Sequence, residues 1–157
     1  MASAAAIEMD QNSALSCVLI PTSQESLLLP NVCIAEIVPW RRIKPADEAP
    51  DWCLGQVGWR GSSLTVIDFA ALNQQPDVSS TPRCLVVMNR ARSSSGPAFY
   101  AIAAQSLPRM LQIADEDLSG QEANLGPADV MKVQVGTEVA TIPDLEYLEN
   151  SIAQLRF

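Results

Sequence analysis

Many short apolar segments, each of strand length, alternate along this chain with proline, glycine, serine and asparagine. Short apolar runs bounded by turn residues are typical of β-strands, whereas a helix needs a longer segment with a period near 3.6. Only the last segment of the chain has that helical period. Roughly eight to ten short strands and one helix favour an all-β domain of barrel type. The expected strands are 15–20, 26–29, 40–43, 54–59, 64–69, 84–88, 98–103, 107–113, 130–135 and 138–142.

Turn residues indicate how these strands are connected. Residues 21–24 predict a hairpin between the first two strands, and residues 60–63 predict another in which Gly61 supplies a positive φ. The polar segment 73–82 contains two prolines and two serines, so it is predicted to be a linker. The apolar run 32–37 is compatible with one helical turn or with a further strand, and its length leaves both open.

Two of the strands have a predicted environment. A proline near the start of 107–113 confines that strand to a sheet edge or a bulge. In 130–135, Met131 and every second residue after it are apolar, while Lys132 and Gln134 lie between them. This alternation predicts a half-buried strand with the apolar residues facing the core.

The C-terminal segment is predicted to be a helix that docks on the domain. Thr141 and Asp144 have the spacing of a capping box, and Pro143 suits a first helical turn. One helix face carries the apolar residues Leu145, Leu148, Ile152 and Leu155.

Composition excludes several classes of protein. The net charge is −8 and basic residues form no cluster, which argues against a nucleic-acid partner. No apolar run is long enough to span a membrane, and the first basic residue is Arg41, so a secretory signal is not expected. The chain is therefore expected to be cytoplasmic. Residues 1–13 lack a sustained pattern and are predicted to be a flexible tail before a single domain at 14–157.

The sequence contains no histidine, which removes a Ser-His-Asp triad, a Cys-His dyad, a histidine-bound metal and a phospho-accepting histidine. No Cys-x-x-Cys occurs among the four cysteines, which are interpreted as reduced, inert thiols. We therefore expect no catalytic residue, no metal and no cofactor. The four are Cys17, Cys33, Cys53 and Cys84.

Three other features are weighed as sites. Residues 115–120 imitate the first half of a calcium loop, but the twelfth position is Gly126 where a glutamate is needed, which favours a solvated acidic loop. Asp68 ends an apolar strand, where local capping or pairing is the expected role of a carboxylate. The three tryptophans lie within 20 residues of each other. Core packing is expected for Trp40 and Trp52, whereas the position of Trp59, beside the hairpin tip, leaves core and surface roles open.

The segment 55–69, GQVGWRGSSLTVIDF, resembles the signature of CheW-like domains, the adaptor modules of bacterial chemosensory arrays. That signature has a glycine, an apolar residue, x-x-Arg-Gly, and an apolar strand ending in Asp. Residues 29–38 resemble an earlier motif that ends in Glu-Ile. Residues 99–113 and 133–148 resemble a later strand pair and the closing strand with its helix. The resemblance covers about residues 15–152 in order.

The chain also departs from the family pattern. Gly58 stands where asparagine is common, and Thr65-Val66 stands where Pro-Val is common. Adaptors of pilus-linked (twitching-motility) chemosensory systems diverge in this way, so the chain resembles one of these.

The resemblance implies two small five-stranded SH3-like barrels sharing an apolar seam. It also implies a non-enzymatic adaptor that couples the cytoplasmic hairpin of a chemoreceptor to the regulatory domain of a histidine kinase, beside membrane-bound receptor arrays. The partner-binding residues that it implies are Val32, Ile34, Glu36, Trp59, Arg60 and Gly61.

Arg60 has two interpretations. In one, its guanidinium caps local carbonyls or pairs with a carboxylate such as Asp68; in the other it contacts a partner, with Trp59 adding apolar area. The alternatives for the whole chain are a β-barrel interaction module of another pathway and an enzyme of unrecognised kind. A deep pocket with convergent polar groups would favour the enzyme.

Overall fold

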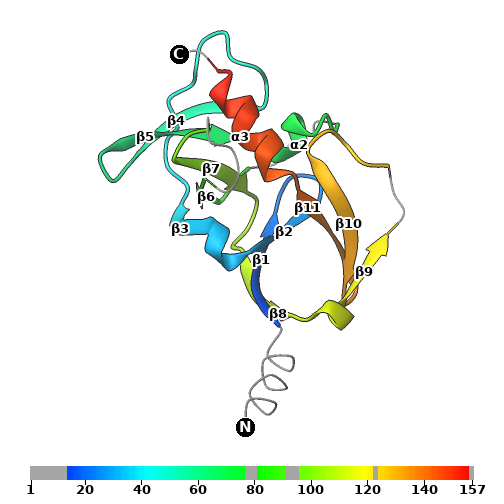
Figure 1. Cartoon of the computed structure of the whole chain (residues 1–157). Coiled ribbons are helices and arrows are strands. Elements are labelled where there is room, and N and C mark those ends of the chain that lie inside the picture. The colour runs from blue at the N-terminus through cyan, green and yellow to red at the C-terminus, as the bar shows by residue number, and fades with distance from the viewer. Residues whose placement is uncertain (1–13, 77–80, 91–95, 122–123, 156–157) are drawn as a thin grey trace.

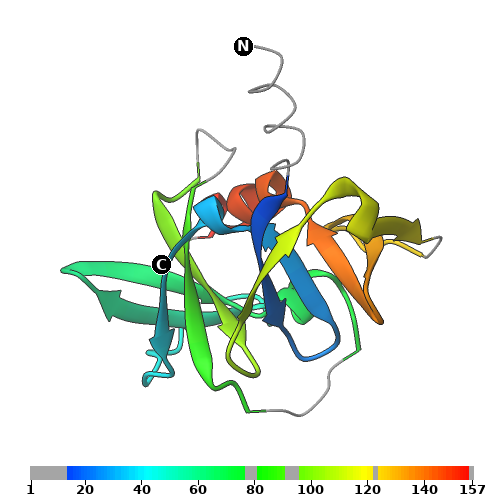
Figure 2. The same cartoon turned by 90° about the horizontal axis from the view of Figure 1, so that it is seen from below.

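The computed structural model describes residues 14–76, 81–90, 96–121 and 124–155. The predicted tail at 1–13 and part of the predicted linker at 73–82 therefore lie outside the described residues. Two β-sheets and a C-terminal helix make up the described part (Figures 1 and 2). This confirms the predicted mostly-β fold with a helix at the C-terminus. Where the resemblance implied two five-stranded units, the described residues form one sheet of six strands and one of five.

The first sheet has six strands in the order β8-β1-β2-β11-β10-β9. Their bounds are β1 Leu15–Pro21, β2 Ser26–Pro30, β8 Arg109–Ile113, β9 Leu118–Gln121, β10 Asp129–Val135 and β11 Glu138–Pro143. The second sheet has five strands in the order β3-β6-β7-β5-β4. Their bounds are β3 Ile34–Pro39, β4 Cys53–Trp59, β5 Ser62–Ile67, β6 Cys84–Asn89 and β7 Phe99–Ala104.

The five-stranded sheet is inserted between strands of the six-stranded one. The chain leaves after β2 through the 3-10 turn η1 (Asn31–Cys33) and returns at β8. Parallel pairing of β2 with β11 and of β5 with β7 then joins segments that are far apart in sequence. The remaining helical elements are the 3-10 turn η2 (Asp115–Asp117) and the helices α2 (Phe69–Leu72) and α3 (Leu145–Ala153).

A buried apolar layer lies between the two sheets and corresponds to the seam that the resemblance implied. It takes Val18 and Ile20 from β1, Val86 and Met88 from β6, and Leu148 from α3, all nearly inaccessible to solvent. The alternate residues of the same strands fill a separate core in each sheet. Strands covered on both faces read as continuous apolar runs, which explains the composition of the central strands.

Helix α3 is held on this seam, as predicted. Leu148 and Ile152 are buried in it, and Leu145 and Leu155 pack against it. The Tyr100 hydroxyl donates a hydrogen bond of 3.1 Å to Oε2 of Glu149 on the same helix. Burial, with the Glu149 carboxylate as the second cause, raises the pKa of Tyr100 above its ordinary range.

The helix begins later than the capping-box spacing predicted. Asp144 is the N-cap, and its Oδ1 accepts a hydrogen bond of 3.0 Å from the backbone N–H of Tyr147. Thr141 and Pro143 belong to β11 instead, because pairing with β10 extends that strand to Pro143. The apolar face was predicted correctly, but its N-terminal boundary was wrong.

Replacing Leu148 by alanine is expected to lower the free energy of unfolding by about 2–4 kcal/mol, because its side chain is fully buried and leaves a cavity. Urea denaturation measures the loss. Gln154→Ala, an exposed change at the end of the same helix, serves as the control and should stay within about 0.5 kcal/mol. A loss below about 0.5 kcal/mol for Leu148→Ala would show that the helix is loosely held.

Three strand predictions were wrong. Residues 40–43 form no strand; Trp40 and Ile43 pack on the five-stranded core, and the following Lys44 makes an isolated bridge with Gln56. The strand expected at 64–69 ends at Ile67, because Asp68 caps the short helix α2. Strand β9 was missed, since its composition is polar and it is held by pairing with β10.

The predicted alternation in β10 was also wrong. Met131 is 40% exposed, whereas Lys132 is buried. Pairing with β11 is regular from Met131 onward, so Lys132 faces the opposite side of the sheet from Val133, where it is buried against Glu25, Asp129 and Thr141. Val133 is buried as predicted.

Two further local predictions agree with the structure. Residues 32–37 contain both elements that were left open, because η1 is followed directly by β3. β8 is an edge strand, and its proline, Pro108, lies just before it.

Candidate partner-binding site

The β4–β5 hairpin projects from the body of the protein (Figures 1 and 2). Trp59 pairs with Ser62, so the turn between them consists of Arg60 and Gly61 alone. Both turn residues have positive φ, 48° and 76°. This is the geometry of a type I′ turn, whose twist matches that of the flanking strands. The positive φ predicted for Gly61 is present, and Arg60 shares it.

Arg60 and Glu36 form an ion pair across the sheet. Nη2 of Arg60 lies 3.0 Å from Oε1 of Glu36, and the two side chains are 69% and 39% exposed. The same Oε1 accepts a hydrogen bond of 3.0 Å from the indole Nε1 of Trp59. The partner of Arg60 is therefore Glu36 and not Asp68, the carboxylate considered from the sequence.

Trp59 supports this pair from below. Its ring is 7% exposed and belongs to the core of the five-stranded sheet. The guanidinium carbon of Arg60 lies 4.8 Å from the ring centroid, within the range of a cation–π contact. The exposed guanidinium is thus fixed by a carboxylate and an indole, which restricts its side-chain freedom.

Contacts between β4 and the loop that follows β3 bring Glu36 to the hairpin. β3 and β4 lie at opposite ends of the strand order, and the loop that joins them runs along β4. Nη1 of Arg41 donates a hydrogen bond of 2.8 Å to the Gly58 carbonyl. Lys44 and Gln56 exchange two backbone hydrogen bonds of 2.8 and 2.9 Å. These contacts curl the sheet, so residues 24 apart in the sequence meet.

Two exposed apolar side chains extend the surface beyond the ion pair. The ring of Phe99 lies 5.0 Å from that of Trp59, and Phe99 is partly exposed. Asn89 pairs with Phe99 in the sheet, and its Nδ2 donates a hydrogen bond of 3.1 Å to the Val32 carbonyl. The Val32 side chain is 80% exposed. We refer to Val32, Glu36, Trp59, Arg60 and Phe99 as the hairpin patch.

The structure thus brings together most of the residues that the resemblance implied. Glu36, Trp59 and Arg60 are in direct contact. Gly61 lies in the adjacent turn, with open space around it. Ile34 is half-buried and packs against the apolar seam, as an ordinary core residue does.

Sequence reasoning missed Phe99 and Asn89. The only local signal was an aromatic residue at the start of a strand that is otherwise buried. That Phe99 meets Trp59 depends on the parallel pairing of β5 with β7, which no local pattern indicates.

Trp40 and Trp52, predicted to be core residues, are half-buried. Trp40 packs against the core of the five-stranded sheet, and Trp52 packs against the seam. The expectation of core packing agrees with these contacts.

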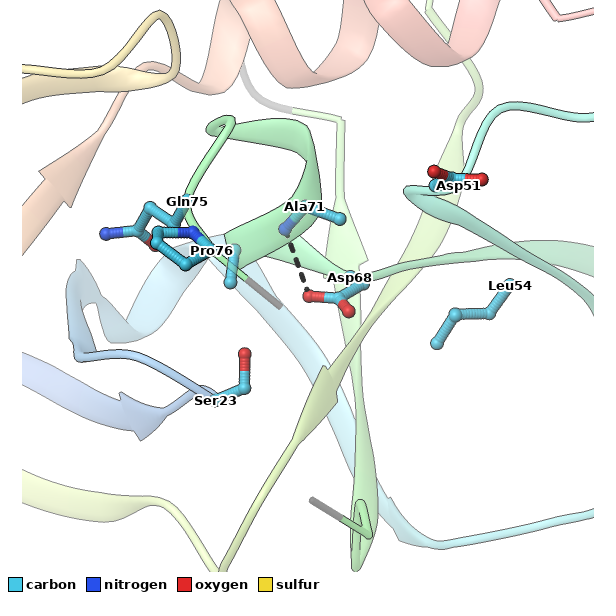
Figure 3. A pocket seen from close by; sticks show the side chains of 8 residues that line it. Ser23, Asp51, Leu54, Asp68, Ala71, Gln75 and Pro76 are labelled. Carbon is cyan, nitrogen blue, oxygen red and sulfur yellow. Dashed lines mark hydrogen bonds between the residues drawn. The ribbon is translucent and has the colours of Figure 1, made fainter. Parts of the chain in front are cut away.

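A cavity of about 410 Å³ beside α2 is the candidate location for an enzyme site (Figure 3). Asp51, Asp68, Ser23 and Gln75 are among its lining residues. The Asp68 carboxylate turns toward α2 and accepts a hydrogen bond of 3.3 Å from the backbone N–H of Ala71. Asp68 is therefore a helix cap, as the sequence favoured.

The cysteines are free thiols, and the acidic residues 115–117 form a short turn. All four cysteines lie in the described part of the chain as thiols, and burial raises the pKa of Cys17, Cys53 and Cys84. Thiols with raised pKa are poor nucleophiles at neutral pH. No group of three or more metal-binding side chains occurs within the described ranges. Residues 115–117 form η2, and Oδ2 of Asp117 accepts a hydrogen bond of 2.9 Å from Ala114 N.

Within the ranges that the structure describes, no helix is long and apolar enough to cross a membrane.

Comparison with known proteins places the fold and the family. The solved structures that match include the scaffolding protein TtCheW from Thermoanaerobacter tengcongensis, with a TM-score of 0.71 and 14% identity. The match covers 86% of this chain and 92% of that one. No curated protein sequence matches. The CheW-like domain family matches residues 16–152. The chain therefore belongs to the family of CheW-like domains, and its fold is similar to that of the scaffolding protein TtCheW.

Proposed function

We propose that this protein is a non-enzymatic adaptor that couples the cytoplasmic hairpin of a chemoreceptor to the regulatory domain of a histidine kinase. The proposed location is the cytoplasm, beside membrane-bound receptor arrays. The observation that carries the proposal is the hairpin patch. It presents a fixed guanidinium on a projecting hairpin, next to exposed apolar side chains, in a chain of the CheW-like family.

The composition of the hairpin patch is that of a protein contact. Interface residues that dominate binding are enriched in tryptophan and arginine, placed in apolar surroundings. Arg60 offers several N–H donors, of which the contact with Glu36 engages Nη2. The remaining donors fit a carboxylate or a backbone carbonyl of a partner. Phe99, against Trp59, and Val32, joined to the neighbouring Asn89, supply exposed apolar area nearby.

The backbone of Arg60 supports the same proposal. A non-glycine residue with φ of 48° costs about 1–2 kcal/mol relative to the right-handed region. Asparagine, aspartate or glycine would adopt the positive φ at this first turn position more easily. Arginine at the site is better explained by a use for its side chain than by the stability of the turn.

We further propose that the adaptor serves a pilus-linked (twitching-motility) system. The basis is the pair of departures from the family pattern, Gly58 and Thr65-Val66. Gly58 lies on the exposed side of β4, and its carbonyl is the acceptor for Arg41. Genetic deletion in the native host, scored separately for twitching and for swimming, tests this assignment.

The adaptor function is tested by co-purification from the native host. The full-length protein, tagged and expressed at its natural level, should recover a chemoreceptor and a histidine kinase together. Recovery of unrelated proteins with neither of these would contradict the proposal and favour an interaction module of another pathway.

Replacing Arg60 by alanine is expected to weaken partner binding by about 2 kcal/mol or more, as a central interface residue does. The melting temperature should change little, because the ion pair with Glu36 is exposed and such pairs contribute about 1 kcal/mol or less. Binding to the purified receptor hairpin and to the kinase regulatory domain is measured by calorimetry.

The matched control is Arg83→Ala. Arg83 is exposed and lies just before β6, at the opposite end of that strand from Asn89, which pairs with Phe99 of the hairpin patch. It should bind both partners normally. If Arg60→Ala also binds both normally, or if it unfolds as readily as the turn variant Gly61→Val, then Arg60 has a structural role and the proposed patch is wrong.

A further inference from the structure

The six-stranded sheet leaves a groove between its two end strands. β8 and β9 are the outermost strands of the sheet, and among the described residues no strand pairs with the outer edge of either. They are joined directly through η2, so they lie at the same end of the molecule, away from the projecting hairpin (Figures 1 and 2). The groove has a volume of about 490 Å³.

The floor of this groove carries apolar side chains, beside the polar Gln112, Ser119 and Gln134 that also line it. Leu111 and Ile113 of β8 contribute from one side, Leu118 of β9 from the other, and Val135 of β10 between them. The same side chains belong to the core of the six-stranded sheet or pack against it. A side chain entering the groove would therefore contact the existing core.

The rim of the groove is acidic. Glu116 and Asp117 line it, and Asp115 adds a third consecutive exposed carboxylate. The nearby Arg109 does not offset these charges, because its Nη2 is 2.5 Å from Oε1 of Glu138. An apolar floor with an acidic rim is complementary to a segment that carries apolar side chains and a basic end.

The backbone of β8 favours an extended ligand. An edge strand presents unpaired N–H and C=O groups, and native proteins usually protect such edges by charge or by covering them. Here Leu107 and Met110, beside and within β8, are exposed apolar residues. This edge is thus suited to pairing with another strand.

We infer that the β8–β9 groove binds an extended segment of a partner protein by strand addition to β8. The segment places apolar side chains on Leu111 and Ile113 and a lysine or arginine against Glu116 and Asp117. This site is separate from the hairpin patch and does not depend on the function proposed for that patch.

The test uses the full-length, 15N-labelled protein and a short peptide of alternating valine and threonine that ends in two lysines. Binding should shift the amide resonances of residues 109–121 and 134–136, while the amide resonances of Arg60 and Gly61 should not shift. Two matched peptides are compared: one ends in two glutamates, and one has proline at its central valine. Neither should bind at the concentration that saturates the lysine peptide.

Glu116→Lys provides the variant test, because Glu116 is exposed and its replacement should not disturb folding. Affinity for the lysine peptide should fall about three- to tenfold, as expected when an exposed charge contact is reversed. The control is Glu48→Lys, the same charge change at an exposed loop position, which should leave the affinity unchanged.

The inference is overturned by any of three results. The first is that the lysine peptide shifts no amide resonances, or shifts only those outside residues 109–121 and 134–136. The second is that the glutamate peptide binds as tightly as the lysine peptide. Concentration-dependent self-association through residues 109–121, without peptide binding, would assign the groove to a second copy of this chain instead.

Discussion

Replacing Lys132 by methionine is expected to lower the free energy of unfolding by about 3–5 kcal/mol, the usual cost of breaking a buried ion pair by removing one partner. The Lys132 side chain is 8% exposed, and its Nζ contacts Glu25. It also lies 3.3 Å from Oδ2 of Asp129 and donates a hydrogen bond of 2.8 Å to Oγ1 of Thr141. Without the ammonium group, two carboxylates remain with no compensating charge.

The groups around Lys132 link the six-stranded sheet to the segment after α2. Nδ2 of Asn73 donates a hydrogen bond of 2.9 Å to Oδ1 of Asp129, and Nε2 of Gln75 donates one of 3.1 Å to Oε1 of Glu25. Asp129 also accepts a hydrogen bond of 2.8 Å from Gly126 N. Such connected polar groups restrict how the two parts of the fold can pack.

Urea denaturation measures the loss of unfolding free energy in Lys132→Met. Lys44→Met, the same change at an exposed position, is the control. Glu25→Gln added to Lys132→Met should recover part of the lost stability, because it removes one of the two uncompensated charges. If Lys132→Met costs no more than Lys44→Met, the buried ion pairs contribute little to the stability of this fold.

Replacing Gly55 by alanine is expected to be the second severe change, with a loss of about 3 kcal/mol or more, from backbone strain together with a steric clash. Gly55 has φ of 132°, which residues with a Cβ rarely adopt. A Cβ there would lie 2.1 Å from the carbonyl oxygen of Lys44 and 2.9 Å from Cγ2 of Ile43. The loop on β4 would have to move away, which disturbs the bridge between Lys44 and Gln56.

Gly58→Ala is the matched control for this prediction. Gly58 lies on the same strand, and a Cβ there would meet no atom within 4 Å. Its effect should be within about 0.5 kcal/mol. Equal stability of the two alanine variants in thermal and urea denaturation would show that the loop is not held tightly on β4.

The sequence predicted the strands of the apolar seam well. The run at 84–88 corresponds to β6, which is buried on both faces, and the run at 15–20 corresponds to β1. Such strands contain enough apolar residues to be recognised without their neighbours. The helical period at the C-terminus was also sufficient to identify α3 and its buried face.

Local patterns failed where a distant partner decides the outcome. β9 is polar and is held by pairing with β10. Lys132 was assigned to the solvent side because a charged side chain is rarely buried unpaired. One of its two compensating carboxylates, at position 25, lies 107 residues away, so no short window of sequence contains that ion pair.

The candidate site shows the same division. The Arg-Gly turn, with a positive φ at Gly61, follows from the sequence because only a few residue types suit that backbone geometry. The family resemblance added Glu36 and Val32 as residues of interest. Neither source indicated that Glu36 is the partner of Arg60, or that Phe99 lies against Trp59.

From the sequence we could predict most of the strands, the C-terminal helix, the hairpin at Arg60 and the absence of histidine chemistry. Each of these follows from residue type and short-range spacing. The folded structure was needed to show the ion pair of Arg60, the buried position of Lys132 and the groove between β8 and β9. These depend on the curling of each sheet and on the parallel pairing of distant strands, which bring together residues that are far apart along the chain.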